Sequence, residues 1–273
     1  MTQESRRLYL IQALMKERAA DAEIMIPEGE PQQKALLRSL FNQRMPAPAA
    51  REFLEIQDAY LQEETARKGI TELSALKPLR NQIYLWRGDI TALRCEAIVN
   101  AANAQLLGCF CPNHNCIDNQ IHTFSGVQLR LACAGLMLRQ GHAEKTGGAK
   151  LTPAFNLPCR YVLHTVGPMI RGRVTREDEK MLASCYRSCL ALAAQNDIKS
   201  IAFCCISTGE YNFPHHLAAT IAVNTVREYL RQKQSGIKVI FNVFKTLNIT
   251  LKEIDDEIYK KLLHANQAPE SRN

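Results

Sequence analysis

Short apolar segments alternate with helical segments along the chain after residue 80. The predicted strands are 82–86, 97–100, 160–166, 200–206 and 238–243, and the predicted helices are 117–138, 178–195, 214–232 and 251–264. Parallel strands need long crossover connections, which are usually helices. The alternation therefore predicts a three-layer α/β/α domain with a mixed or mainly parallel sheet that helices cover on both faces.

The first 78 residues have a different pattern. Helices are predicted at about 6–20, 32–42 and 49–68, with prolines between them and Gly69 as a stop signal. The first of these places Leu8, Ile11, Met15 and Ala19 on one face. No strand pattern precedes residue 80, so we expect a small helical extension (1–78) that serves packing or oligomerisation. An α/β domain (79–264) and a polar tail (265–273) follow it.

Charge and cysteine content narrow the class of protein. The net charge of +7, from 34 basic and 27 acidic residues, favours an anionic partner such as a nucleotide. No basic-aromatic tract indicates nucleic-acid binding, and no apolar run approaches the roughly 20 residues that cross a membrane. The N-terminal segment is amphipathic and lacks a signal-peptide cleavage site, so we expect a cytoplasmic protein. In that setting the ten cysteines are expected to be free thiols and metal ligands.

The segment GCFCPNHNCIDNQIH, residues 108–122, concentrates metal-binding side chains in one loop. Cys109, His114 and Cys116 have the spacing C-x4-H-x-C. Three such ligands can hold zinc and leave a fourth position open. Cys111 lies within the same loop, and if it also bound the metal the site would be closed and structural.

Three loops that follow predicted strands carry unusual residues. They are Gly88-Asp89, the segment from Asn103 through the cysteine loop, and residues 207–213. In open α/β sheets, ligands bind beyond the carboxyl ends of the strands. Residues 207–214 read STGEYNFP, which suits a phosphate cradle at a helix N-terminus, and residues 146–150 could form a second wall. Taken alone, either loop is better explained as an ordinary turn, and only the pair of loops opposite the cysteine loop favours a phosphate site.

Four motifs resemble those of a known family. They are GDIT at 88–91, IVNAAN at 98–103, HTVGP at 164–168 and STGEYNFP at 207–214. In order and spacing they resemble the macrodomain, an ADP-ribose-binding fold, over residues 80–262. The 108–122 insertion resembles that of zinc-containing macrodomain ADP-ribosylhydrolases. That class is linked to microbial sirtuin-like ADP-ribosyltransferases and also carries a helical N-terminal extension.

The resemblance implies a role for each matching residue. Asp89 would bind the adenine amino group beside the Ile90 backbone, and Asn103 would face the distal ribose. Asp118 matches the aspartate that metal-free hydrolytic macrodomains carry in a Val-Asp-Gly-Ala-Ile-His run. The diphosphate and distal-ribose loop would consist of Ser207, Thr208, Gly209, Glu210 and Tyr211, and the zinc ligands would be Cys109, His114 and Cys116. Asn212 departs from the pattern, because many macrodomains have glycine there.

The activity implied is removal of mono-ADP-ribose from modified protein side chains. One Zn²⁺ per chain would assist at the distal ribose, while Asp118 orients or deprotonates water and Asn103 fixes the sugar. The partners implied are a mono-ADP-ribosylated protein and, functionally, a sirtuin-like ADP-ribosyltransferase. Two alternatives remain open: a reader module that binds ADP-ribose with a structural zinc, and a hydrolase of O-acetyl-ADP-ribose-like metabolites.

The remaining histidines and cysteines favour structural roles. His122 and His164 lie in apolar segments and are expected to be hydrogen-bonded core residues, and His215-His216 is expected to begin a helix. The cysteines at apolar positions are expected to pack as small hydrophobic side chains; they are Cys133, Cys185, Cys189, Cys204 and Cys205.

Overall fold

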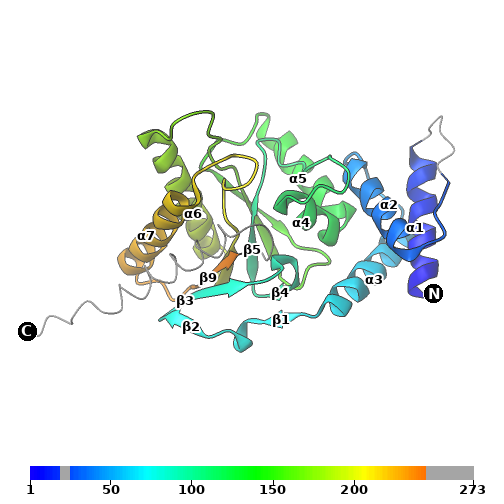
Figure 1. Ribbon diagram of the computed structural model, residues 1–273, viewed down its shortest axis with the longest axis horizontal. Helices are drawn as coiled ribbons and strands as arrows, with labels where there is room; N and C mark the ends of the chain where they lie inside the picture. Colours follow the sequence, from blue (N-terminus) through cyan, green and yellow to red (C-terminus); the bar gives the residue numbers. More distant parts are fainter. Residues whose placement is uncertain (19–24, 244–273) are drawn as a thin grey trace, which may run out of the picture.

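A seven-stranded mixed sheet forms the centre of the molecule in the computed structural model, which describes residues 1–18 and 25–243 (Figure 1). The strand order is β2-β3-β9-β8-β5-β7-β6. The strands are β2 (Pro78–Arg80), β3 (Ile83–Arg87), β5 (Ala97–Ala101), β6 (Ala149–Pro153), β7 (Tyr161–Thr165), β8 (Ser200–Phe203) and β9 (Lys238–Val243). The expected α/β fold with a mixed sheet is confirmed.

The five inner strands run parallel, and the two edge strands are antiparallel to their neighbours. The central strands are buried on both faces, with all four residues of β8 buried and all but the last residue of β5. This explains their continuous apolar sequences. Because β3, β5 and β8 are parallel, their carboxyl ends lie at one edge of the sheet, where the three predicted loops begin.

Helices cover the two faces of the sheet. In Figure 1, α6 (Arg176–Gln195) and α7 (His215–Lys233) lie on one side, and α4 (Ile117–Ser125) and α5 (Val127–Gln140) lie on the other. The main core is continuous between the layers and includes fully buried side chains from strand and helix, such as Ile98 and Leu129. A second, two-stranded parallel sheet pairs β1 (Thr71–Glu72) with β4 (Leu93–Arg94).

The N-terminal helices form a bundle with its own apolar core. They are α1 (Gln3–Glu17), α2 (Glu30–Gln43) and α3 (Arg51–Lys68), and α2 and α3 pack against α4. Val127 of α5 belongs to this second core, so the bundle is joined to the α/β domain by apolar packing. The predicted face of α1 was wrong in part: Leu10, Ile11 and Leu14 are the buried apolar residues, while Leu8 and Met15 are only partly buried.

Three features differ from the sequence predictions. The short strands β1 and β2 begin before residue 80, and β4 and β6 were not predicted. The predicted 117–138 helix is two helices, because Gly126 has φ +94°, and a Cβ there would lie 2.6 Å from the Gln57 side-chain nitrogen.

In residues 1–18 and 25–243, no helix is long and apolar enough to cross a membrane. The predicted 251–264 helix and the polar tail lie outside the described residues, and the domain boundaries stay predictions.

Candidate functional site

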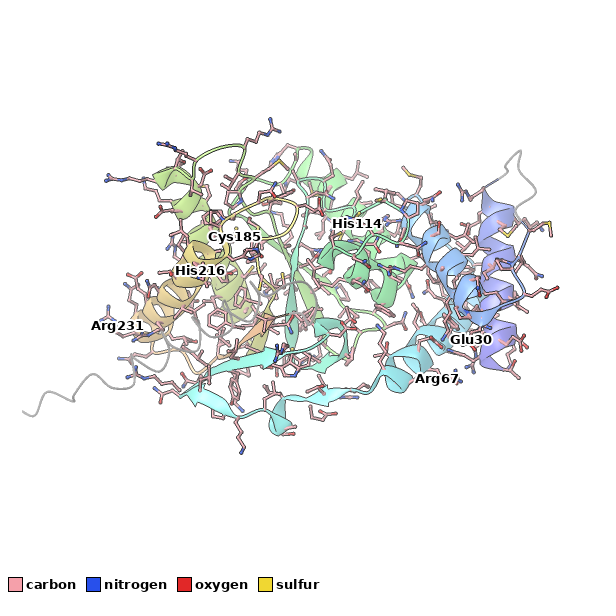
Figure 2. All side chains as sticks on the ribbon, in the orientation of Figure 1. Glu30, Arg67, His114, Cys185, His216 and Arg231 are labelled. Carbon is pink, nitrogen blue, oxygen red and sulfur yellow. The ribbon has the colours of Figure 1, made fainter. Side chains whose placement is uncertain are left out.

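The loop between β5 and α4 brings the three predicted metal ligands together. The ligand atoms of Cys109, His114 and Cys116 all lie within 4.8 Å of one another. Cys116 is the N-cap of α4, and its Sγ accepts a hydrogen bond from the Asn119 amide at 3.4 Å. Cys111 is exposed and lies outside this group. Figure 2 labels His114, which lies on the side of the α/β domain that faces the extension.

The geometry of this group fits zinc. Nδ1 of His114 lies 3.5 Å from Sγ of Cys109. Ideal tetrahedral coordination places a bound nitrogen and sulfur about 3.6 Å apart, so the two atoms need little movement to share an ion. Nε2 of His114 lies 3.4 Å from a carboxylate oxygen of Glu210. A carboxylate on the second nitrogen of a histidine is the arrangement that commonly orients a metal-binding imidazole.

Asp118 lies in the first turn of α4 and is almost completely buried. Its Oδ1 accepts a hydrogen bond from the Asn100 amide at 2.7 Å, and its Oδ2 lies 3.5 Å from the Asn103 amide nitrogen. Burial raises the pKa of the Asp118 carboxyl to about 6, although the Asn100 hydrogen bond and the Arg130 charge act in the opposite direction. The carboxyl group is therefore held in a dry site beside the candidate metal loop.

Asn103 links Asp118 to the start of the loop. Its side-chain amide donates to the Gly108 carbonyl at 3.1 Å, and its side-chain oxygen accepts from the Gln105 amide at 3.0 Å. These contacts hold the side chain beside Gly108 and 3.5 Å from the Asp118 carboxyl. Asn103 and Asp118 therefore lie next to each other on either side of the loop that carries the three predicted ligands, and their roles stay predictions.

Residues 207–214 form the loop between β8 and α7. Ser207 and Asn212 have φ values of +65° and +54°. Asparagine is among the few residues that adopt this left-handed conformation readily, so Asn212 serves where many macrodomains have glycine. Within the described residues, the backbone amides of Gly209, Glu210 and Tyr211 donate to no acceptor. A row of free amides ahead of a helix suits an anion such as a phosphate.

Tyr211 is the residue of this loop that senses the charge of Asp118. Burial, and secondarily the Asp118 charge, raise the pKa of its phenol. Its carbonyl accepts a hydrogen bond from the Ile170 amide at 2.8 Å, which ties the loop to the segment after β7. The His114–Glu210 contact ties the same loop to the candidate metal site. Two of the three loops that carry unusual residues are therefore in contact, at His114 and Glu210.

Asp89 and Ile90 follow β3 at the same edge of the sheet. Asp89 caps a short helix, η2 (Ile90–Ala92), by accepting hydrogen bonds from the Thr91 amide at 2.9 Å and the Thr91 hydroxyl at 2.6 Å. Its other oxygen lies 3.2 Å from Nζ of Lys68, the last residue of α3. η2 packs against α4 and Ile90 is buried. In residues 1–18 and 25–243, no hydrogen bond or ion pair joins Asp89 to the metal loop. The adenine role of Asp89 stays a prediction.

The structure also places the glycine-bearing loop at 146–150 and the two predicted core histidines. Residues 146–148 form a turn that leads into β6, in which the Gly147 amide donates to the Val166 carbonyl and the Gly148 amide donates to that of Lys145. These two amides are therefore already bonded within the protein. His164 is a hydrogen-bonded core residue, with Nε2 2.9 Å from the Thr152 hydroxyl. His122 is buried as expected, but within the described residues neither ring nitrogen has a hydrogen-bond partner.

The cysteines outside the loop are mostly core residues, as predicted. Cys133, Cys185, Cys189 and Cys204 are buried. Cys205 is the exception: its residue is exposed, and its Sγ donates to the Asn242 carbonyl at 3.6 Å. His215 is the first residue of α7, as the sequence predicts.

The sequence reasoning missed the residues that support the site from a distance. Asn100 holds Asp118, and it was read only as the last residue of a strand. Arg38 and Asn42 of α2 bond to the metal loop, and Lys68 of α3 bonds to Asp89. The sequence holds no local signal for these contacts, because the partners are 18 to 81 residues apart along the chain.

Comparison with known proteins agrees with this geometry. A family model described as Macro domain matches residues 99–222. A protein-ADP-ribose hydrolase of Treponema medium is 54% identical over 267 residues, which cover 96% of this chain and 100% of the relative. The chain belongs to the macrodomain protein-ADP-ribose hydrolase family. The expectation of an enzyme of this kind is confirmed at that level.

Other members and structures extend the comparison. A protein-ADP-ribose hydrolase of Staphylococcus aureus (strain MSSA476) is 46% identical over 250 residues and covers 91% of this chain and 94% of its own length. A crystal structure of the Trypanosoma brucei macrodomain in complex with ADP-ribose has a TM-score of 0.60 and 30% identity, and it covers 83% of this chain and 94% of that one. The macrodomain fold is therefore shared with a protein that binds ADP-ribose.

Proposed function

We propose that this macrodomain protein removes mono-ADP-ribose from modified protein side chains, with zinc assisting at the distal ribose. The observation that carries the proposal is the arrangement of Asp118, Asn103 and the group of three soft ligands at the carboxyl end of β5. The close relatives named as protein-ADP-ribose hydrolases support the reaction class. The ligand geometry supports the metal.

Residues on several elements would hold the substrate. Asp89 and the Ile90 backbone would bind adenine at the end of β3, and Asn103 would bind the distal ribose. The free amides ahead of α7 would bind the diphosphate, with Ser207 and Thr208 at the start of that loop and Gly209, Glu210 and Tyr211 within it. Anchoring the nonreacting part of the substrate positions the scissile bond, and positioning of this kind supplies much of an enzyme's rate.

Asp118 would act on the attacking water. Its carboxylate is fixed by Asn100 and retains lone pairs that can accept a hydrogen bond from a water molecule. Cys109, His114 and Cys116 would hold Zn²⁺, which when bound polarises an oxygen of the substrate or of water. The reaction consumes one water and yields free ADP-ribose and the unmodified side chain.

A release assay tests this function. A mono-ADP-ribosylated protein is incubated with zinc-replete protein, with chelator-treated protein whose zinc content has been measured, and with treated protein after zinc is restored. We expect release of ADP-ribose to fall on chelation and to recover with zinc. Release that is unaffected in demonstrably zinc-free protein would contradict zinc assistance. Retained ADP-ribose binding without release, under zinc-replete conditions, would favour the reader alternative.

The finer parts of the proposal concern the source and kind of substrate. A sirtuin-like ADP-ribosyltransferase in the cytoplasm would supply the modified protein. Rates on protein-linked ADP-ribose and on O-acetyl-ADP-ribose, measured side by side, separate the two substrate classes. A faster reaction on the free metabolite would contradict the protein-directed assignment.

A further inference from the structure

The segment that carries the metal ligands has little structure of its own. Residues 102–116 contain no helix or strand, and their internal backbone hydrogen bonds include Leu106 to Asn103 at 3.0 Å and His114 to Cys111 at 3.3 Å. Metal ligands must be held close to their final geometry if binding is to be strong. The order of this loop must therefore come from its contacts with other parts of the molecule.

Arg130 of α5 makes two of these contacts, with the Leu107 carbonyl at 2.7 Å and the Phe110 ring at 4.3 Å. Arg38 of α2 contacts the part of the loop that carries His114, and it also contacts Asn119 of α4. Its Nη2 donates to the His114 carbonyl at 2.6 Å and to the Asn119 side-chain oxygen at 2.8 Å, and its Nε donates to the same oxygen at 3.3 Å. The fixed fork of a guanidinium makes such paired contacts directional. Arg38 thus holds the backbone of one predicted ligand and the side chain of Asn119 in one arrangement.

Asn119 contacts the backbone or the sulfur atom of both predicted thiol ligands. Its side-chain nitrogen donates to the carbonyls of Cys111 at 3.0 Å and Cys109 at 3.4 Å, while its backbone amide donates to Sγ of Cys116. The residue is completely buried. Its amide group is therefore fully engaged between the loop on one side and Arg38 on the other.

A second contact from α2 fixes the tip of the loop. The side-chain oxygen of Asn42 accepts a hydrogen bond from the Asn113 amide at 2.9 Å, and its nitrogen donates to the Thr123 hydroxyl at 3.0 Å. Asn113 has φ +55°, and Asn42 is buried. The same helix therefore restrains the loop on both sides of His114 and at the following helix.

We propose that the helical extension is a structural part of the metal site, and that Arg38 is a positioning residue that holds the ligand loop through Asn119 and His114. The inference rests on the zinc site of the proposed function. It gives the extension a role in the chemistry, whereas the sequence indicated only packing or oligomerisation.

Zinc affinity tests the proposal in the full-length chain. Wild type, Arg38→Ala, Arg38→Lys and the control Arg6→Ala are compared by competition with a chromogenic chelator. We expect Arg38→Ala to weaken zinc binding by about tenfold or more, as for other residues that orient metal ligands. Arg38→Lys, which keeps the charge without the fork, should lose part of the affinity. Among the residues that the structure describes, Arg6 bonds only within the extension, at 2.7 Å to Glu63 and 3.2 Å to Gln3, so its variant should match wild type.

A double-mutant cycle identifies the route of the effect. If Arg38 acts through Asn119, then Asn119→Ala should weaken zinc binding much less in the Arg38→Ala background than in wild type. Circular dichroism and ADP-ribose binding establish that each variant is folded. If Arg38→Ala is not folded, the zinc affinity of Arg38→Lys tests the proposal instead. Wild-type affinity in a folded Arg38 variant would overturn this inference alone. Wild-type protein without affinity for zinc would overturn the metal site on which it rests.

Discussion

Asp118, Asn100 and His164 form a chain of polar side chains inside the α/β domain. The Asn100 amide donates to Asp118 at 2.7 Å and lies 3.2 Å from Nδ1 of His164. Buried polar groups of this kind cost stability unless they are paired. The hydrogen bond from Asn100 fixes the orientation of Asp118, a buried carboxyl group near the predicted ligands, so a cost in stability is offset by a defined geometry.

Replacement of Asp118 tests its chemical role. Asp118→Asn keeps the size of the side chain but removes its charge and one acceptor. We expect release of ADP-ribose to slow by about 100-fold or more, within the range typical of acid–base groups, while ADP-ribose binding measured by calorimetry stays close to wild type. Asp197→Asn is the matched control, because Asp197 is exposed and has φ +54°, which asparagine also adopts. Equal turnover in Asp118→Asn would remove this residue from the mechanism.

His164 predicts a specific dependence of stability on pH. Burial lowers the pKa of its imidazole to about 3, below the roughly 6.5 of an exposed histidine. The unfolded chain therefore takes up a proton first as the pH falls, and this residue's contribution to stability, present above pH 6.5, is lost between there and pH 3. Between pH 7 and pH 5, the contribution of His164 lowers the free energy of unfolding by about 2 kcal/mol.

Comparison of variants isolates the contribution of His164 to the pH dependence of stability. Asp118, whose pKa burial raises to about 6, acts in the opposite direction, so the absolute slope is not diagnostic. We expect the free energy of unfolding of His164→Gln, from urea titrations, to fall by about 2 kcal/mol less than that of wild type between pH 7 and pH 5. His142→Gln, at an exposed position, should keep the wild-type slope. The same slope in His164→Gln would contradict the assignment.

At the scale of elements, the loop before α4 depends on Gly108. This residue has φ +79°, and a Cβ placed on it would lie 2.7 Å from Cγ of the buried His122 ring. We expect Gly108→Ala to reduce the free energy of unfolding by about 1–3 kcal/mol, the usual cost of a strained backbone residue. Gly172→Ala should be nearly neutral in the same urea titrations, since in the described part of the chain no atom beyond its two neighbouring residues lies within 4 Å of its Cβ position. Equal stability of the two variants would contradict this account.

Prediction from the sequence succeeded where the signal was local. Cys109, His114 and Cys116 are close in sequence, and the apolar runs of β5 and β8 are bounded by clear turns. It failed where packing decides the outcome. β6 contains Lys150 and Pro153 and is recognisable as a strand only from its pairing with β7. The contact between Arg38 and Asn119 joins residues 81 positions apart, and no pattern within either helix indicates it.

At the scale of the molecule, the extension and the α/β domain share an interior. Gln57 of α3 accepts a hydrogen bond from the Val127 amide at 2.9 Å, and Asp58 accepts one from the Asn156 side chain at 2.6 Å. Val127 itself packs in the core of the extension. These contacts predict that the two parts unfold together.

The single tryptophan makes this prediction measurable. Trp86 lies in β3, whereas much of the helical signal comes from the extension. We expect urea transitions followed by tryptophan fluorescence and by circular dichroism to coincide. Leu37→Ala, at a buried site of the extension, should shift both by about 2–5 kcal/mol, and Leu138→Ala, at an exposed site, should shift neither. A separate helical transition would contradict the shared interior.

The edges of the sheet have a consequence for the behaviour of the protein at high concentration. β2 and β6 are the edge strands of the described sheet, and each contains a proline, Pro78 and Pro153, that is exposed. Proline has no backbone N–H to offer an incoming strand. Each edge therefore resists pairing with a neighbouring molecule, so the parallel interior of the sheet is protected from edge-to-edge aggregation.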